Sequence, residues 1–256
     1  MLFVAAGAAA QPAKKQKDIS AEVTALSSAD PAAAAKAAAD LGALDLPAAH
    51  EALLDALAMG LPAQVAVPAI SALAAHPAPP DVASLRRYAH HHNPTVRSAA
   101  LAALAAYPSP EARGAIAAGL RDPNGSVRAA AAGAAMRGRV RDAVDPLLQL
   151  LARGEEPAGK ALAGLADLDL ARRIGDELGK VPDAALAKCL GAILLRADFG
   201  PDPARVEIVR AIAKIQDASA VAALTDYIDA TPKNPPRPSR SEAVGVVEAR
   251  LAGGGK

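Results

Sequence analysis

The sequence predicts an all-α protein, an α-α superhelix of about seven antiparallel helix pairs. Three observations predict it: a motif that recurs after about 31 residues, apolar positions that keep this period, and an alanine-rich composition. Hydrophobic residues make up 52% of the 256 residues but aromatic residues only 2%, so alanine and leucine must fill the core. Repeats of this length are typical of stacked units that cover each other's apolar faces.

The recurring motif is a helix start followed by an alanine-rich helix. Residues 93–104 read NPTVRSAALAAL, and residues 122–131 read DPNGSVRAAA. An Asn or Asp before the helix accepts a hydrogen bond from a free backbone N–H, and Pro at the first helical position lacks an N–H that would have no partner. Asp30-Pro31 gives the same signal near the start of the chain.

Fifteen helices are expected in order. Their ranges are 19–28, 32–44, 47–59, 62–75, 79–90, 94–107, 110–120, 126–137, 141–151, 157–165, 168–178, 182–195, 202–215, 219–229 and 241–251. The proline-rich stretch 231–240 contains Pro235-x-x-Pro238 and is interpreted as a stiff connector. Ser239 and Glu242 have the spacing of a capping box for the last helix.

Two columns of apolar residues run in phase through five units. The first helices supply one column, whose members are equally spaced along the chain: Leu54, Leu85, Ile116, Leu147 and Leu178. The second helices supply the other, whose spacing is almost the same throughout: Ala35, Val65, Val96, Val127 and Ala158. Each pair therefore has an apolar stripe that neighbouring pairs must cover, which predicts a gently curved solenoid with a continuous core.

These residues resemble the HEAT repeat, in which Val-Arg follows Asn/Asp-Pro and opens an Ala-Ala-x-x-Ala-Leu-like helix. The chain is more narrowly similar to bacterial HEAT-like repeats first grouped with phycobilin lyases, over residues 20–251 and most clearly over 79–152. The resemblance implies second helices along a concave face. It also implies that the arginine of Val-Arg pairs with Asp or Asn of adjacent repeats. Arg97 and Arg128 match that arginine, Lys36 is a possible substitute, and Ala66 departs from the pattern.

The N-terminal residues predict a separate segment. Residues 1–10 are apolar and end in three alanines, like the later part of a secretory signal peptide, although a basic start is missing. Residues 1–17 are therefore expected to be a signal-peptide-like segment and linker, and residues 18–256 the solenoid. This favours export to the periplasm or medium, with a cytoplasmic location as the alternative.

Charge is uneven along the chain although the total is only +1. Residues 18–85 carry eight acidic residues and one lysine, whereas residues 86–141 carry nine arginines and two acidic residues. A protein partner with an acidic surface is the expected ligand of this middle region. Seven arginines are candidates to bind it: Arg86, Arg87, Arg113, Arg121, Arg137, Arg139 and Arg141. Nucleic acid fits less well, because aromatics for stacking are scarce.

Four motifs resemble known chemistry and are interpreted as structure. Residues 154–161 have G-x-x-x-x-G-K spacing, but Ala161 replaces the Ser or Thr and no strand precedes it. His90–His92 are adjacent rather than four apart, so they cannot all face one metal. His50-Glu51 is a single pair of the kind that HEAT-type hydroxylases use several times. Cys189 lies in an apolar helix and is expected to be buried.

The sequence therefore predicts a non-enzymatic scaffold that presents a curved surface to a protein, with no catalytic, cofactor-binding or metal-binding residue. Two alternatives stay open: a lyase-like or metal-dependent enzyme on the same scaffold, and a nucleic-acid binder. A pocket lined by converging histidines and carboxylates would favour the enzyme. A continuous basic groove would favour nucleic acid, and a smooth face with paired arginines would favour the scaffold.

Overall fold

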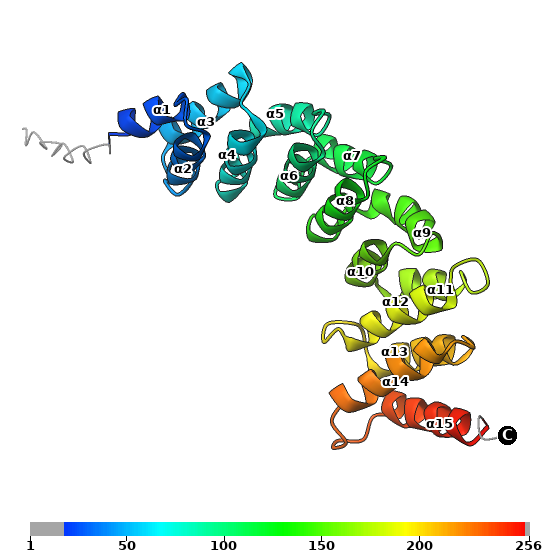
Figure 1. The fold of residues 1–256 in the computed structure, drawn as a ribbon. Coiled ribbons are helices and arrows are strands. Elements are labelled where there is room, and N and C mark those ends of the chain that lie inside the picture. The colour runs from blue at the N-terminus through cyan, green and yellow to red at the C-terminus, as the bar shows by residue number, and fades with distance from the viewer. Residues whose placement is uncertain (1–17, 254–256) are drawn as a thin grey trace, which may run out of the picture.

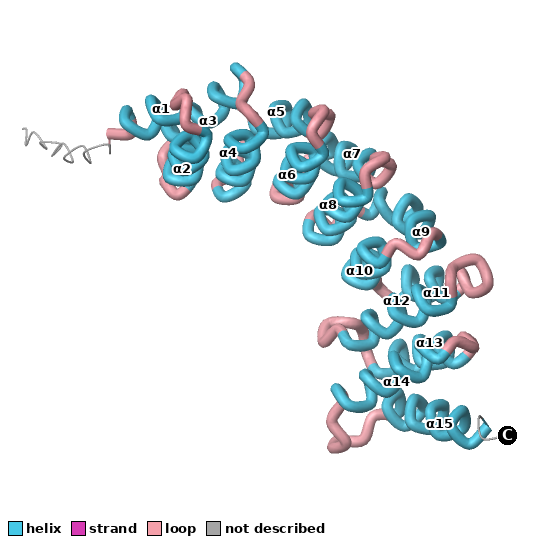
Figure 2. Tube along the Cα trace, viewed as in Figure 1, coloured by secondary structure: helices cyan, strands magenta, loops and turns pink. Residues whose placement is uncertain are grey.

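The computed structural model describes residues 18–253 as a curved stack of antiparallel helices (Figure 1). These residues form fifteen α-helices and one short 3-10 helix, and they contain no strand beyond an isolated bridge between Leu178 and Val181 (Figure 2). The all-α prediction and the fifteen expected helices are confirmed, with differences of a few residues at helix ends.

The helices form seven pairs and a final single helix. The first pair is α1 (Ser20–Leu26) and α2 (Pro31–Gly42). The first helices of the next six pairs are α3 (Pro47–Met59), α5 (Asp81–Tyr88), α7 (Pro110–Gly119), α9 (Val144–Ala152), α11 (Leu168–Gly175) and α13 (Asp202–Ala213). Their second helices are α4 (Ala63–Ala75), α6 (Pro94–Leu104), α8 (Gly125–Arg137), α10 (Glu156–Leu165), α12 (Asp183–Leu195) and α14 (Ala218–Ala230). The 3-10 turn Arg141–Ala143 precedes α9, and α15 (Pro238–Gly253) packs on the last pair.

The second helices form the inner row of the arc and the first helices the outer row (Figure 1). Small residues let neighbouring inner helices approach closely. A Cβ built on Gly42 of α2 would lie 2.3 Å from the Ala72 Cβ of α4, and one on Gly191 of α12 would lie 2.8 Å from the Ala223 Cβ of α14. Close inner spacing, with a more loosely packed outer row, bends the stack into an arc.

A buried column with one equally spaced member per repeat runs along the inner row. It consists of Ala34, Val65, Val96, Val127, Ala158, Cys189 and Ala220, each at most 2% exposed. Ala34 replaces the expected Ala35, because α2 begins at Pro31 and turns Ala35 partly toward solvent. In the other expected column, Leu85, Ile116 and Leu147 are buried, but Leu54 is half-buried and Leu178 is 36% exposed. The column is wrong at Leu178 because α11 ends before it, at Gly175.

The predicted helix-start caps are confirmed at three helices, whereas Asp202 lies inside α13 and its carboxylate bonds Ser239 instead of the first turn. The side chains of Asp30, Asn93 and Asn124 accept hydrogen bonds from backbone N–H groups in the first turns of α2, α6 and α8. The capping box at Ser239 is wrong. Ser239 lies inside α15, where its hydroxyl and N–H bond Asp202 and where Tyr227 contacts the same hydroxyl, while Glu242 pairs with Arg210.

The predicted signal-like segment and linker, residues 1–17, lie outside the described residues. Within residues 18–253, none of the helices is long and apolar enough to cross a membrane.

Candidate functional site

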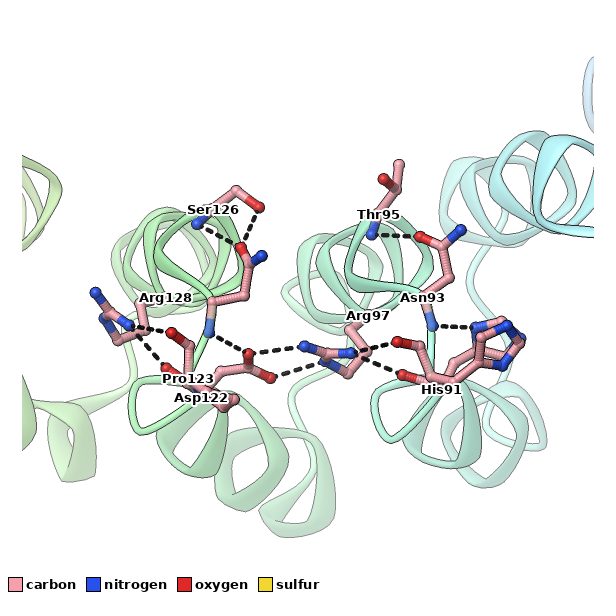
Figure 3. Close-up of polar contacts among 10 residues, drawn as sticks. His91, Asn93, Thr95, Arg97, Asp122, Pro123, Ser126 and Arg128 are labelled. Atoms are coloured by element: carbon pink, nitrogen blue, oxygen red, sulfur yellow. Dashed lines mark hydrogen bonds and ion pairs between the residues drawn. The ribbon is translucent and has the colours of Figure 1, made fainter.

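Arg97 joins two neighbouring repeats at the turns between their helices (Figure 3). From α6, its Nε and Nη2 donate to the two carboxylate oxygens of Asp122, at 2.8 and 2.9 Å. Its Nη1 donates to the backbone carbonyls of His91 and His92, at 2.9 and 3.0 Å. The guanidinium thus fixes its own turn and the next one. This bond is also the main reason that the pKa of Asp122 lies below its usual value.

Arg128 repeats this arrangement one unit later. Its Nη1 donates to the carbonyls of Asp122 and Pro123, at 2.9 and 3.1 Å (Figure 3). Its Nε lies 3.0 Å from Glu155 Oε1. The predicted pairing of both arginines with the next repeat is confirmed, with a glutamate in place of Asp or Asn at the second. We call these two arginines and their acceptors the arginine ladder.

The ladder ends on both sides where the arginine position holds a small residue. That position is Ala66 one repeat earlier and Gly159 one repeat later. His91 occupies the place of Asp122 in the earlier repeat, and its Nδ1 accepts the Asn93 N–H at 3.1 Å. The expectation that Lys36 substitutes for the arginine is wrong, because Lys36 pairs with Asp40 on its own helix.

A buried carboxylate joins the second and third helix pairs near the start of the arc. Asp81 is 0% exposed, and its Oδ2 accepts the Tyr107 hydroxyl at 2.7 Å and the Ala78 N–H at 2.9 Å. Its Oδ1 lies 2.7 Å from His50 Nε2. Burial and the neighbouring carboxylate raise the pKa of Tyr107 well above its usual value. We call His50, Asp81 and Tyr107 the polar clamp. Its members lie at least 26 residues apart along the chain, in two neighbouring helix pairs, so sequence reasoning missed it.

His50 also lines a pocket of about 310 Å³ between the first two helix pairs. Glu51, Asp45 and His76 line the same pocket, and His76 Nδ1 lies 3.5 Å from Asp45 Oδ1. The walls are otherwise apolar. Among residues 18–253 no group of three or more His, Cys, Asp or Glu side chains is placed to hold a metal ion. The pocket therefore contains acid–base groups without a metal-ligand geometry.

The seven candidate arginines are spread over the molecule. Arg121 ends α7, whereas Arg137 ends α8 at the opposite edge, about 20 Å away along a 13-residue helix. Arg139 and Arg141 follow Arg137 at that edge, and Arg141 pairs with Asp167 at 2.8 Å. On the outer row, Arg87 donates to the Leu57 carbonyl. Arg86 and Arg113 flank Glu111 there. Partner binding by these arginines stays a prediction.

Two of the other sequence interpretations are confirmed. Gly154 lies in a turn between helices with φ 76°, and Gly159 and Lys160 lie within α10, so residues 154–161 are not a strand–loop–helix phosphate loop. Cys189 is 2% exposed, and burial raises the pKa of its thiol to about 12, so the thiolate needed for nucleophilic attack is scarce.

The fold defines a class of protein, the α-solenoid of stacked helix pairs, and the sequence comparison narrows it. Residues 51–137 and 82–166 each match the family model for HEAT repeats. Residues 51–166 are therefore HEAT repeats, as their Val-Arg motifs predicted. The comparison with curated protein sequences gave no match.

Solved structures show the same architecture. One is the complex of CpcE and CpcF of phycocyanin lyase from Nostoc sp. PCC7120. The match has 18% identity and a TM-score of 0.50, and it covers 97% of this chain and 99% of that one. Another is the karyopherin Kap121p bound to Ste12p, with 15% identity and a TM-score of 0.53. That match covers 88% of this chain but only 28% of Kap121p. At these identities the similarity establishes the fold alone.

Proposed function

We propose that the protein is a scaffold that binds a protein partner on the inner face of the arc. The observation that carries the proposal is the composition of that face. On the side that the first helices do not cover, the inner helices of four consecutive repeats carry a small residue at the equivalent position. These residues are Ser71, which is exposed, and Ala102, Gly133 and Gly164, which are partly exposed. Small side chains there let a partner approach the backbone closely, although Met136 lies against Gly164. The Kap121p structures include complexes with Ste12p and with the C-terminus of Cdc14p, which supports protein binding on such a scaffold.

The partner that we propose has an acidic surface. Arg137 ends the inner helix α8, is exposed, and has no carboxylate within ion-pair distance among residues 18–253. Its only hydrogen bond there is a long one, 3.4 Å, to the Ala102 carbonyl of α6. Arg139 is exposed two residues later. The ladder arginines are already bonded internally, so Arg137 and Arg139 are the cations next to this part of the inner face that remain for a partner's carboxylates.

A crosslinking experiment separates the inner face from the outer one. A photoreactive residue replaces Ala130 on the inner helix α8 or Gln149 on the outer helix α9, and the protein is irradiated in its native host. We expect a discrete adduct from position 130, reduced by added salt and by Arg137→Glu. Arg86→Glu on the outer row makes the same charge change and is expected to leave the adduct intact. Adducts from position 149 alone would refute the proposal.

Export remains part of the proposal and rests on the apolar residues 1–10. Cell fractionation of a C-terminally tagged full chain tests it directly. We expect a shortened product in the exported fraction, and a full-length product retained in the cytoplasm would overturn it.

An enzyme on this scaffold is a second candidate, which the pocket beside His50 favours. An imidazole held by a buried carboxylate, as His50 is by Asp81, is the usual arrangement of a general base. A screen with activated esters and amides would test it. Activity that disappears in His50→Ala but persists in the exposed control His90→Ala would support the enzyme.

A further inference from the structure

A cavity of about 370 Å³ lies between α10 and α12, toward the edge where the arginine ladder runs. Its walls include Leu151, Gly159, Pro182, Ala185 and Cys189, and its charged lining residues are Lys160, Lys188 and Glu156. It is of the size that binds small molecules. Neither the inner-face proposal nor the polar clamp involves these residues.

The period of the chain explains why this cavity exists. Arg97 bonds the carbonyls of residues 91 and 92, and Arg128 bonds those of residues 122 and 123, which hold the same places one repeat later. One repeat further on, the equivalent carbonyls are those of Arg153 and Gly154. The position equivalent to Arg97 and Arg128 is occupied by Gly159. In the first two repeats a guanidinium and its stem fill this space. In the third repeat Gly159 supplies no side chain, Leu151 Cδ1 lies 3.2 Å from where its Cβ would be, and Gly154 and Gly159 line the cavity.

The walls of the cavity suit an apolar part of a ligand, and the lysines that line it suit a negatively charged part. The wall residues named above are aliphatic or small, and the Cys189 thiol is protonated at neutral pH. Lys188 is exposed and has no ion-pair partner in the described part of the chain. Lys160 pairs with Glu156 at 2.9 Å, but both side chains are largely exposed. A pair of this kind contributes little, so Lys160 can turn to another anion.

We propose that this cavity binds a small organic anion with an apolar tail, of the medium-chain carboxylate class. The head group lies between the ammonium groups of Lys160 and Lys188. The tail packs on Leu151, Pro182, Ala185 and Cys189. A guanidinium from a partner is the less suitable occupant, because both lysines repel it. A nucleotide is also less suitable, because its several negative charges would be repelled by Glu155 and Glu156 more strongly than the single charge of a carboxylate.

Octanoate is the probe, and octanamide of equal length is the uncharged control. The full chain is labelled with 15N and titrated while backbone amide signals are followed by NMR. We expect saturable shifts at Gly154, Gly159, Ala185 and Cys189 with octanoate, and weaker ones with octanamide. Lys160→Gln with Lys188→Gln should raise the Kd by about tenfold, because the head group loses both cations.

A matched double variant controls for net charge. Lys214→Gln with Lys233→Gln removes two exposed lysines elsewhere and should leave the Kd unchanged. The same spectra report whether each variant is folded. The proposal is overturned if millimolar octanoate shifts none of the four amides, if octanamide binds equally well, or if both double variants change the Kd alike. Octanoate binding is measured at the cavity and not at the inner face. The result therefore does not depend on the outcome of the crosslinking experiment.

Discussion

At the scale of single residues, polar side chains fix how neighbouring repeats fit together. The alanine side chains between the repeats do not do so by themselves. Alanine has one rotamer and a small surface, so an alanine-rich interface fixes the relative position of two helices only loosely. The polar clamp and the arginine ladder add directional hydrogen bonds between neighbouring pairs. We infer that these contacts set the register of the stack as well as stabilise it.

Asp81→Ala tests the polar clamp. The substitution leaves the Tyr107 hydroxyl, the Ala78 N–H and His50 without their shared acceptor. We expect the free energy of unfolding to fall by about 3 kcal/mol, because each buried donor left without an acceptor costs about 1–3 kcal/mol. Urea denaturation measures it. Asp145→Ala is the control, because its exposed carboxylate pairs with Arg173 at the surface and should contribute at most about 1 kcal/mol.

Arg97→Ala tests the ladder through pH. The pKa of Asp122 is below its ordinary value of 3.8, chiefly because Arg97 bonds the carboxylate. A carboxylate with a lowered folded-state pKa stabilises the fold above its unfolded-state pKa, and this stability is lost as the pH falls. We expect the variant to have a lower urea midpoint than the wild type at pH 7, with the difference shrinking below about pH 4. A difference that stays constant with pH would contradict the ladder.

At the scale of the helices, the sequence predicts features that depend on neighbouring residues. It does not predict contacts between residues far apart along the chain. The caps at Asp30, Asn93 and Asn124 follow from neighbouring residues, so the sequence predicts those helix starts correctly. Asp81 could not be assigned its role, because its partners His50 and Tyr107 lie far from it along the chain. Ser239 has a capping pattern, but a tertiary bond to Asp202 uses its side chain instead. Tertiary contacts overrode the local signal there.

Two glycine substitutions test why the inner helices pack so closely. A Cβ on Gly191 would lie 2.8 Å from the Ala223 Cβ, so Gly191→Ala must push α12 and α14 apart. We expect a loss of about 1–3 kcal/mol, typical of overpacking. Gly114→Ala in the outer helix α7 meets no atom within 4 Å. It should raise stability by about 0.5–1 kcal/mol, because alanine favours a helix. Chemical denaturation compares them, and equal effects would refute the close-packing account.

At the scale of the whole molecule, each helix pair contacts mainly its neighbours. A destabilising substitution should therefore affect only the pairs close to it. We expect Asp81→Ala to speed hydrogen exchange in α3 to α7 while α12 to α15 keep their protection. Gly191→Ala should do the reverse. Mass spectrometry of exchanged peptides gives both patterns. Uniform loss of protection along the chain would show a single cooperative unit instead of a stack.

The candidate surfaces were only partly predictable at this scale. Composition shows that residues 86–141 are rich in arginine, but not which side chains are used internally. Arg97 and Arg128 could be assigned because they repeat in phase. The sequence could not show that Arg121 and Arg137 lie on opposite edges of the molecule, because their positions depend on where each helix ends.

The short length of the arginine ladder has a mechanical consequence. Two guanidinium groups brace the turns from residue 91 to residue 155, while Ala66 and Gly159 leave the joints on either side without such a strut. At the edge where the ladder runs, the turns of the middle repeats should therefore hold their spacing more firmly than the turns on either side. A partner that contacts this edge meets a rigid centre between two turns that can adjust to it.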